Sequence, residues 1–320
     1  DPHKPFWKPA DQQGSHKVSR IFRAREVPIP GFLFDDPLVR EELALYYTSV
    51  RRADDAVGSI LGALKESGRE ENTVVIFLSD HGMPLPFAKT QLYHHSTRTP
   101  LIVRWPGITR PGAIDGKHMV SAVDLLPTIL DMAGLKHPRG FDGRSFLPVI
   151  KGNPQESRDS VFKVYNENAG GNRHPIRGVQ TRTYLYLFNP WSDGVNVFRT
   201  ATNGTATYRQ MKKLAPTNPS IAARLQMMDH RTVEELYDVR NDPDCLRNLV
   251  EDPKHAAALR EHRTLLENHM VSTNDHALAP FRKRNDPTAL AAYMKKVQDA
   301  SNTRRAKKRR KKRTAQPGRE

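Results

Sequence analysis

The chain has 320 residues, a formal net charge of +16 at pH 7 and a hydrophobic fraction of 37%. This length excludes a peptide too short to bury a core and supports a large domain together with a smaller one. The single cysteine, Cys245, excludes an intrachain disulfide and a multi-cysteine metal site. No apolar run approaches the roughly 20 residues that span a bilayer, so the sequence predicts no transmembrane segment.

The first predicted element is a long helix from residue 37 to about residue 67, after a polar, Pro-rich stretch. Its apolar residues recur with a period close to 3.6, as on the buried face of a helix. Gly68 is placed to cap its C-terminus.

A strand is predicted for residues 73–78, which are almost entirely β-branched, aromatic or leucine side chains. Such a run suits a central parallel strand that is covered on both faces. It stops at Ser79-Asp80-His81-Gly82. In open α/β sheets ligands gather outside the carboxyl ends of the strands, so Asp80 and His81 lie where a ligand is expected.

The α/β pattern continues to about Gly152. Residues 101–105 are predicted to form a strand, and residues 121–133 a helix that ends at Gly134. Beyond this point the pattern predicts strands at 160–165 and 178–188, loops over 190–231, a turn at 241–244 and a helix at 254–270. Strands that follow an α/β stretch indicate a smaller domain with an antiparallel sheet.

The C-terminal residues are strongly basic. Every position from 304 to 313 is Lys or Arg except Ala306, and apolar residues become sparse from about residue 275. This composition predicts a disordered tail.

Asp80 and Lys89 form the most informative pair of polar residues. A carboxylate is the kind of ligand that hard divalent cations prefer. A lysine that follows in the same loop adds a point charge, and together the two suit a tetrahedral anion.

With these features the chain resembles the sulfatase family. The resemblance rests on the SDHG run at 79–82, the KTQLY run at 89–93 and the TRTPLIVRWPG run at 97–107. The DHGMPLP run at 80–86 is similar to the heparan N-sulfatase (N-sulfoglucosamine sulfohydrolase) branch. Further similar segments are DPHKPF at 1–6, VDLLPTILDMAG at 123–134 and ELYDVRNDP at 235–243.

The resemblance implies an α/β fold, namely the C-terminal part of an alkaline-phosphatase-like α/β/α sandwich over residues 1–152. A subdomain with an antiparallel sheet and a terminal helix would follow at 153–274, and the basic tail at 275–320. Asp80 would be a Ca²⁺ ligand, and His81 either a second ligand or a hydrogen-bond partner of the nucleophile or the sulfate. Lys89 would contact the sulfate, and His3 the sulfate or the leaving group.

The family's nucleophile is missing from the sequence. It lies in a C-x-P-x-R or S-x-P-x-R motif, whose Cys is oxidised to formylglycine, and no such motif occurs in these 320 residues. Cys245, in a PDCLR run, is interpreted as a structural thiol. The chain alone is therefore expected to show little or no hydrolysis of a sulfated sugar, its expected substrate.

Two other interpretations stay open. A tetrahedral anion site also suits a phosphoric or phosphonic ester hydrolase of the same superfamily. The basic tail suits a non-catalytic protein that binds a polyanion, because nine cations in ten positions neutralise phosphates or sulfates. The family resemblance implies a periplasmic, secreted or lysosomal location.

Overall fold

The computed structural model describes residues 2–8, 17–168 and 170–314. The chain divides into two compact units, which are described separately here. Unit 1 comprises residues 1–84, 95–161 and 181–183, and unit 2 comprises residues 85–94, 162–180 and 184–320.

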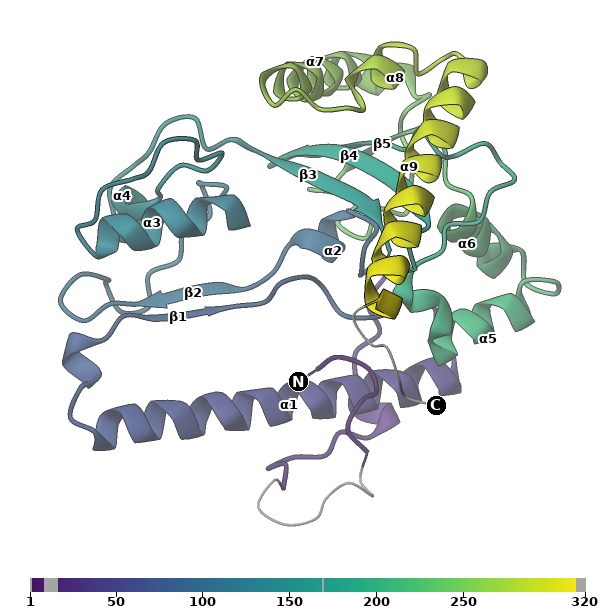
Figure 1. Ribbon diagram of the computed structural model, residues 1–320. Coiled ribbons are helices and arrows are strands. Elements are labelled where there is room, and N and C mark those ends of the chain that lie inside the picture. The colour runs from purple at the N-terminus through teal and green to yellow at the C-terminus, as the bar shows by residue number, and fades with distance from the viewer. Residues whose placement is uncertain (1, 9–16, 169, 315–320) are drawn as a thin grey trace. The chain divides into compact units, whose positions relative to one another are not determined.

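Unit 1 contains the predicted long helix, α1 (Pro37–Glu66), shown in Figure 1. The Asp36 side chain caps its first turn by accepting a hydrogen bond from the backbone N–H of Leu38 at 2.9 Å. Beyond its last turn, Gly68 adopts a left-handed φ of 67°. Both predicted ends of the helix are confirmed. They could be predicted because capping signals lie close to the ends in the sequence.

The strand predicted at 73–78 is observed as β1 (Val75–Leu78), but its surroundings differ from the expectation. It pairs antiparallel with β2 (Leu101–Arg104), with Leu78 opposite Leu101. Phe77 and Leu78 are 40% and 43% exposed. The prediction of a central parallel strand covered on both faces is wrong for the described residues, because an apolar run does not specify the direction or number of partner strands.

Three shorter helices complete the regular structure of this part of the chain: α2 (His94–Thr97), α3 (Leu125–Met132) and α4 (Leu147–Ile150). Gly134 ends the α3 region with a φ of 66°, as predicted. The buried Arg158 guanidinium pairs with Asp124 at 2.7 Å. Asp124 also accepts the backbone N–H of Arg144, so this carboxylate joins segments that are far apart in the sequence.

Unit 2 is built on a sheet with the strand order β3-β4-β5-β6. The strands are β3 (Ser160–Glu167), β4 (Arg173–Thr181), β5 (Tyr184–Phe188) and β6 (Glu234–Asp238). The run at 178–188, predicted as one strand, is split between β4 and β5 by a turn. β6 begins next to the ELYDVRNDP run at 235–243 that resembles the family, and both β4-β5 and β5-β6 are antiparallel.

Two helices and the first part of a third pack on one face of this sheet (Figure 1): α7 (Ala256–Ser272), α8 (Leu278–Arg282) and the start of α9 (Pro287–Thr314). Their buried side chains, including Leu266, Phe281 and Leu290, pack with Tyr186 and Phe188 of β5. The disordered tail expected at 275–320 is thus not observed between 278 and 314, where two helices form, and its residues 315–320 lie outside the described part of the chain. The prediction failed because the basic composition outweighed a few apolar residues, such as Phe281 and Leu290, that pack in the core.

Residues 190–231 also differ from the predicted loops. They contain α5 (Ala206–Leu214) and α6 (Pro219–Asp229). Thr205 caps α5, and Asn218 caps α6 ahead of a proline at its first position. None of the described helices is long and apolar enough to cross a membrane.

The opposite face of the sheet carries buried polar groups. Gln180 lies opposite Leu185, and Leu185 opposite Tyr237, so the three share a face. On this side the amine of Lys163 donates to Gln180 Oε1 at 2.5 Å and to the Leu92 carbonyl at 3.3 Å. Burial lowers the pKa of Lys163 to about 7.

Phe281→Ala is expected to lower the free energy of unfolding by about 3–5 kcal/mol, because Phe281 is fully buried and its ring lies edge-on to Phe188 at 5.2 Å. Urea denaturation followed by circular dichroism measures this. Val271→Ala, on an exposed position of α7, is the control and should change the value by less than about 0.5 kcal/mol. Equal stability of the two variants would show that residues 278–290 contribute nothing to the core.

Lys163→Met is expected to change how stability depends on pH. Between about pH 7 and pH 10 the unfolded chain keeps this amine protonated while the folded chain does not, so the free energy of unfolding rises with pH. The variant should lack this rise, which amounts to at most about 1.4 kcal/mol per pH unit. Urea titrations at several pH values compare it with Lys151→Met, at an exposed position; parallel curves for wild type and Lys163→Met would contradict the assignment.

Candidate functional site

The turn after β1 is held by the backbone. Ser79 N–H donates to the Pro100 carbonyl at 3.4 Å, and Gly82 N–H donates to the Ser96 carbonyl at 3.0 Å. The Ser79 hydroxyl donates to the carbonyl of His81 at 2.9 Å, which closes the turn on itself. These bonds fix the direction in which the chain presents Asp80 and His81.

Asp80 and His81 face each other, as their adjacency in the sequence allows. His81 Nε2 lies 3.4 Å from Asp80 Oδ2, and the Asp80 side chain is 84% exposed. His81 Nδ1 lies 2.7 Å from the Gly82 carbonyl, which can only accept, so Nδ1 carries a proton. Nε2 then either presents a lone pair toward the carboxylate or carries a second proton. In the first case a cation between the two groups would relieve their repulsion.

The donor set around Asp80 fits part of a hard metal site. Asp80 offers carboxylate oxygens, whereas Ca²⁺ takes six to eight oxygen ligands and imidazole is a poor partner for it. No group of three or more His, Cys, Asp or Glu side chains in the described part of the chain is arranged to hold a metal ion. Asp80 can therefore supply one ligand of such a site and not the complete set.

His3 lies in an exposed segment whose neighbours are anchored to α1. The ring of Phe6 contacts that of Tyr46 at 5.8 Å, and Trp7 N–H donates to the Ser49 hydroxyl at 3.0 Å. His3 itself is exposed, and its Nδ1 donates to the carbonyl of Lys4 at 2.6 Å. The backbone near His3 is thus held to α1 within unit 1, and the His3 side chain is exposed.

Lys89 belongs to unit 2, in the segment Leu85–His94. We call residues 85–94 the lysine segment. Its apolar side chains are almost fully buried, with Leu85 and Tyr93 at 0% and Phe87 at 1% exposure, whereas Lys89 is partly exposed. Of the four predicted site residues, the structure brings Asp80 and His81 together; His3 and Lys89 are each placed on separate segments.

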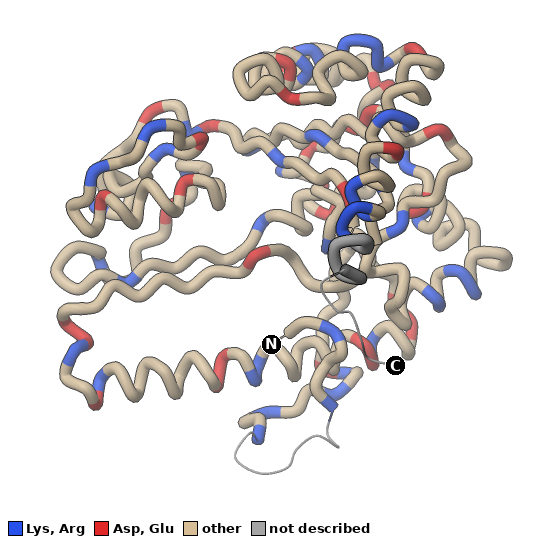
Figure 2. Tube along the Cα trace, in the orientation of Figure 1, with Lys and Arg blue, Asp and Glu red and all other residues tan. Residues whose placement is uncertain are grey.

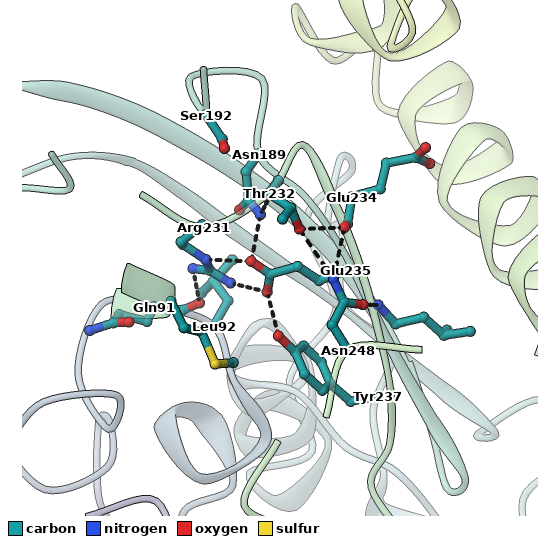
Figure 3. A network of polar contacts seen from close by, with 12 residues as sticks. Gln91, Leu92, Asn189, Ser192, Arg231, Thr232, Glu234, Glu235, Tyr237 and Asn248 are labelled. Atoms are coloured by element: carbon teal, nitrogen blue, oxygen red, sulfur yellow. Dashed lines mark hydrogen bonds and ion pairs between the residues drawn. The ribbon is translucent and has the colours of Figure 1, made fainter. Parts of the chain in front are cut away.

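Sequence reasoning missed the groups that hold the lysine segment. Arg231 and Glu235 form a buried ion pair next to it, with Nη2–Oε2 at 2.6 Å (Figure 3). Burial opposes the charge on Arg231, but the neighbouring Glu235 and Tyr93 outweigh it and raise the pKa of the guanidinium. The sequence offers one signal for this ion pair. Arg231 and Glu235 are four positions apart, next to the start of β6.

Cys245 is buried, as its interpretation as a structural thiol requires. Burial raises its pKa to about 12. Because the thiolate is the reactive form, this environment opposes a role as nucleophile.

Two family models match the chain. The sulfatase model matches residues 1–135, and the model of the C-terminal region of N-sulphoglucosamine sulphohydrolase matches residues 80–198. The two matches overlap on the segment that contains Asp80, His81 and Lys89. Members of the family generally use a metal ion and a formylglycine.

Curated relatives agree with these models. An ulvan-active sulfatase of Formosa agariphila is 28% identical over 254 residues, which cover 79% of this chain and 42% of the relative. Human N-sulphoglucosamine sulphohydrolase is 29% identical over 276 residues, which cover 78% of this chain and 52% of the relative. The chain therefore spans about half the length of these relatives.

The fold agrees as well. A solved 2-O GAG sulfatase superposes with a TM-score of 0.57 and 23% identity, over 81% of this chain and 48% of that chain. This likeness confirms the predicted alkaline-phosphatase-like α/β fold. From the two family models, the relatives and the fold together, the chain belongs to the sulfatase family.

Proposed function

We propose that the protein is a hydrolase of sulfuric esters or sulfamates on sulfated sugars. The observation that carries this proposal is the match of both family models across the segment that holds Asp80 and Lys89. The relative named N-sulphoglucosamine sulphohydrolase supports a sulfated amino sugar as the substrate class. A phosphoric or phosphonic ester hydrolase of the same superfamily remains the alternative, since a tetrahedral anion site separates sulfate from phosphate weakly.

Each of the four site residues has a proposed role. Asp80 is one ligand of a Ca²⁺ ion, and His81 shares that ion or a proton with it, in keeping with the 3.4 Å separation of their polar atoms. The Lys89 ammonium binds a sulfate oxygen as a point charge. His3, which is exposed, contacts the sulfate or the leaving group. When bound, Ca²⁺ would supply positive charge that polarises the sulfate.

Lys89→Ala is expected to weaken the binding of inorganic sulfate to the Ca²⁺-loaded chain by about tenfold or more. A hydrogen bond to a charged group contributes about 1.5–3 kcal/mol, which corresponds to this factor. Isothermal titration calorimetry measures the affinity, with Lys151→Ala as the control at an exposed position. Unchanged affinity in Lys89→Ala would contradict the proposed role.

This chain alone should release no sulfate from glucosamine N-sulfate, because no C-x-P-x-R or S-x-P-x-R motif occurs in it.

We also propose that the basic end of α9 binds sulfated polysaccharide. The helix continues through the basic run, and Figure 2 shows Lys and Arg on α9 ahead of the part drawn in grey. Lys307 and Lys308 are exposed, whereas Arg304 pairs with Glu167. The exposed cations on a helix are therefore available to a polyanion, as an accessory to the proposed hydrolase.

Replacing Lys307 and Lys308 with alanine is expected to weaken heparin binding and its dependence on salt. Each contacting cation that is lost should reduce the slope of log K against log salt by about 0.7–0.9, as for phosphate contacts. Binding at several salt concentrations compares this variant with a Lys212, Lys213 double alanine variant, which removes the same charge from exposed positions on α5. Equal slopes in both variants would contradict a site on α9.

A further inference from the structure

The lysine segment has a strained backbone. Phe87, Thr90 and Leu92 have left-handed φ angles of 67°, 67° and 62°, and none of them is glycine. L-residues pay a steric cost in this region and keep it only where the surrounding structure dictates the conformation. All three lie within three positions of Lys89. The groups that impose this conformation therefore also determine how Lys89 is presented.

Two buried basic side chains donate to consecutive carbonyls of the lysine segment. Arg231 Nη1 donates to the Gln91 carbonyl at 2.9 Å, and Lys163 Nζ donates to the Leu92 carbonyl at 3.3 Å. Leu92 is one of the left-handed residues, and Gln91 lies between it and Thr90, the second. Both bonds thus act on the strained part of the segment, two and three residues after Lys89.

Arg231 has a rigid support. Glu235 accepts from Nε at 2.8 Å and from Nη2 at 2.6 Å, which fixes the plane of the guanidinium. Glu235 also accepts from Asn189 Nδ2 and from the Tyr237 hydroxyl, both at 3.1 Å (Figure 3). The guanidinium lies over the Tyr93 ring at 4.4 Å, so it contacts the lysine segment by a second route.

We propose that Arg231, oriented by Glu235, is a positioning residue for Lys89. It does not touch the anion; it fixes the Gln91 carbonyl and the Tyr93 ring, and thereby the left-handed turn that follows Lys89. This inference rests on the proposed function insofar as Lys89 is the sulfate-binding cation. The dependence of the lysine segment on Arg231 follows from contacts within unit 2 and does not require the proposed function.

The neighbouring residue of β6 offers a less buried comparison pair: Arg263 is 27% exposed, against 0% for Arg231, and its partner Glu234 is also paired with Arg284. Arg263 forms the same forked pair with Glu234, with Nε–Oε1 at 2.8 Å and Nη2–Oε2 at 2.6 Å. Successive residues of a strand point to opposite faces, so Glu234 and Glu235 lie on different sides of the sheet. Arg263 lies on α7, which covers the face opposite to the lysine segment.

The test compares Arg231→Lys with Arg263→Lys in the 320-residue chain. Lysine keeps the positive charge but cannot make the two parallel hydrogen bonds of a guanidinium to a carboxylate. Hydrogen–deuterium exchange of residues 85–94 should be faster by about tenfold or more in Arg231→Lys, and within about twofold of wild type in Arg263→Lys. The rate of acylation of Lys89 by a small amine-reactive reagent should change in the first variant only. A general loss of stability in Arg231→Lys would also speed the exchange of α7 on the other face of the sheet, which should stay within about twofold of wild type.

Equal effects in the two variants, or no effect in Arg231→Lys, would overturn the proposal. If Arg231→Lys does not fold, Glu235→Gln replaces it, because it preserves size and removes the charge that orients Arg231. Inorganic sulfate added to the Ca²⁺-loaded wild-type chain separates the two claims. If sulfate does not slow the acylation of Lys89, the proposed role of Lys89 fails, while the exchange result alone decides the role of Arg231.

Discussion

The buried pair of Arg231 and Glu235 is the interaction on which the arrangement of unit 2 depends most. Both side chains are almost completely removed from water, at 0% and 2% exposure. Desolvation costs several kcal/mol for each ion and is offset only where geometry and further hydrogen bonds are good. Here the forked contact, Asn189, Tyr237 and the Gln91 carbonyl provide them. Loss of one partner would leave the other charge buried and unpaired, at a cost of about 3–5 kcal/mol.

The predicted site residues are held by two different kinds of interaction. In unit 1, the turn with Asp80 and His81 is fixed by backbone hydrogen bonds to Ser96 and Pro100. In unit 2, the segment with Lys89 is fixed by side chains that lie 71 and 140 positions further along the chain. The first kind follows from a strand and a glycine turn. The second depends on the complete packing of the antiparallel sheet, so it is sensitive to substitutions far from Lys89.

Much of the fold was predictable where its signals are local. The ends of α1 and the Gly134 turn follow from the helical period and from capping residues. The caps of α5 and α6, Thr205 and Asn218, were local signals too, but the polar composition around them outweighed them. The antiparallel partner of β1 and the packing of Phe281 were not predictable in this way, because they depend on contacts between distant segments.

The candidate site shows the same division. The proximity of Asp80 and His81 follows from adjacency, and the role proposed for Lys89 from its spacing and the family resemblance. The support from Arg231 and Lys163 was not predictable from one sequence, because a buried cation is recognised by the environment that folding builds around it. Arg and Lys are mostly exposed, so each of these residues taken alone indicates a solvated charge.

The most direct measurement is a double-mutant cycle of Arg231→Lys and Glu235→Gln, with the exchange rate of residues 85–94 as the readout. If the two residues act as one support for the lysine segment, the double variant should exchange no faster than the more affected single variant, because either change already removes the same interaction. Effects that multiply in the double variant would show that they act independently, which contradicts the account.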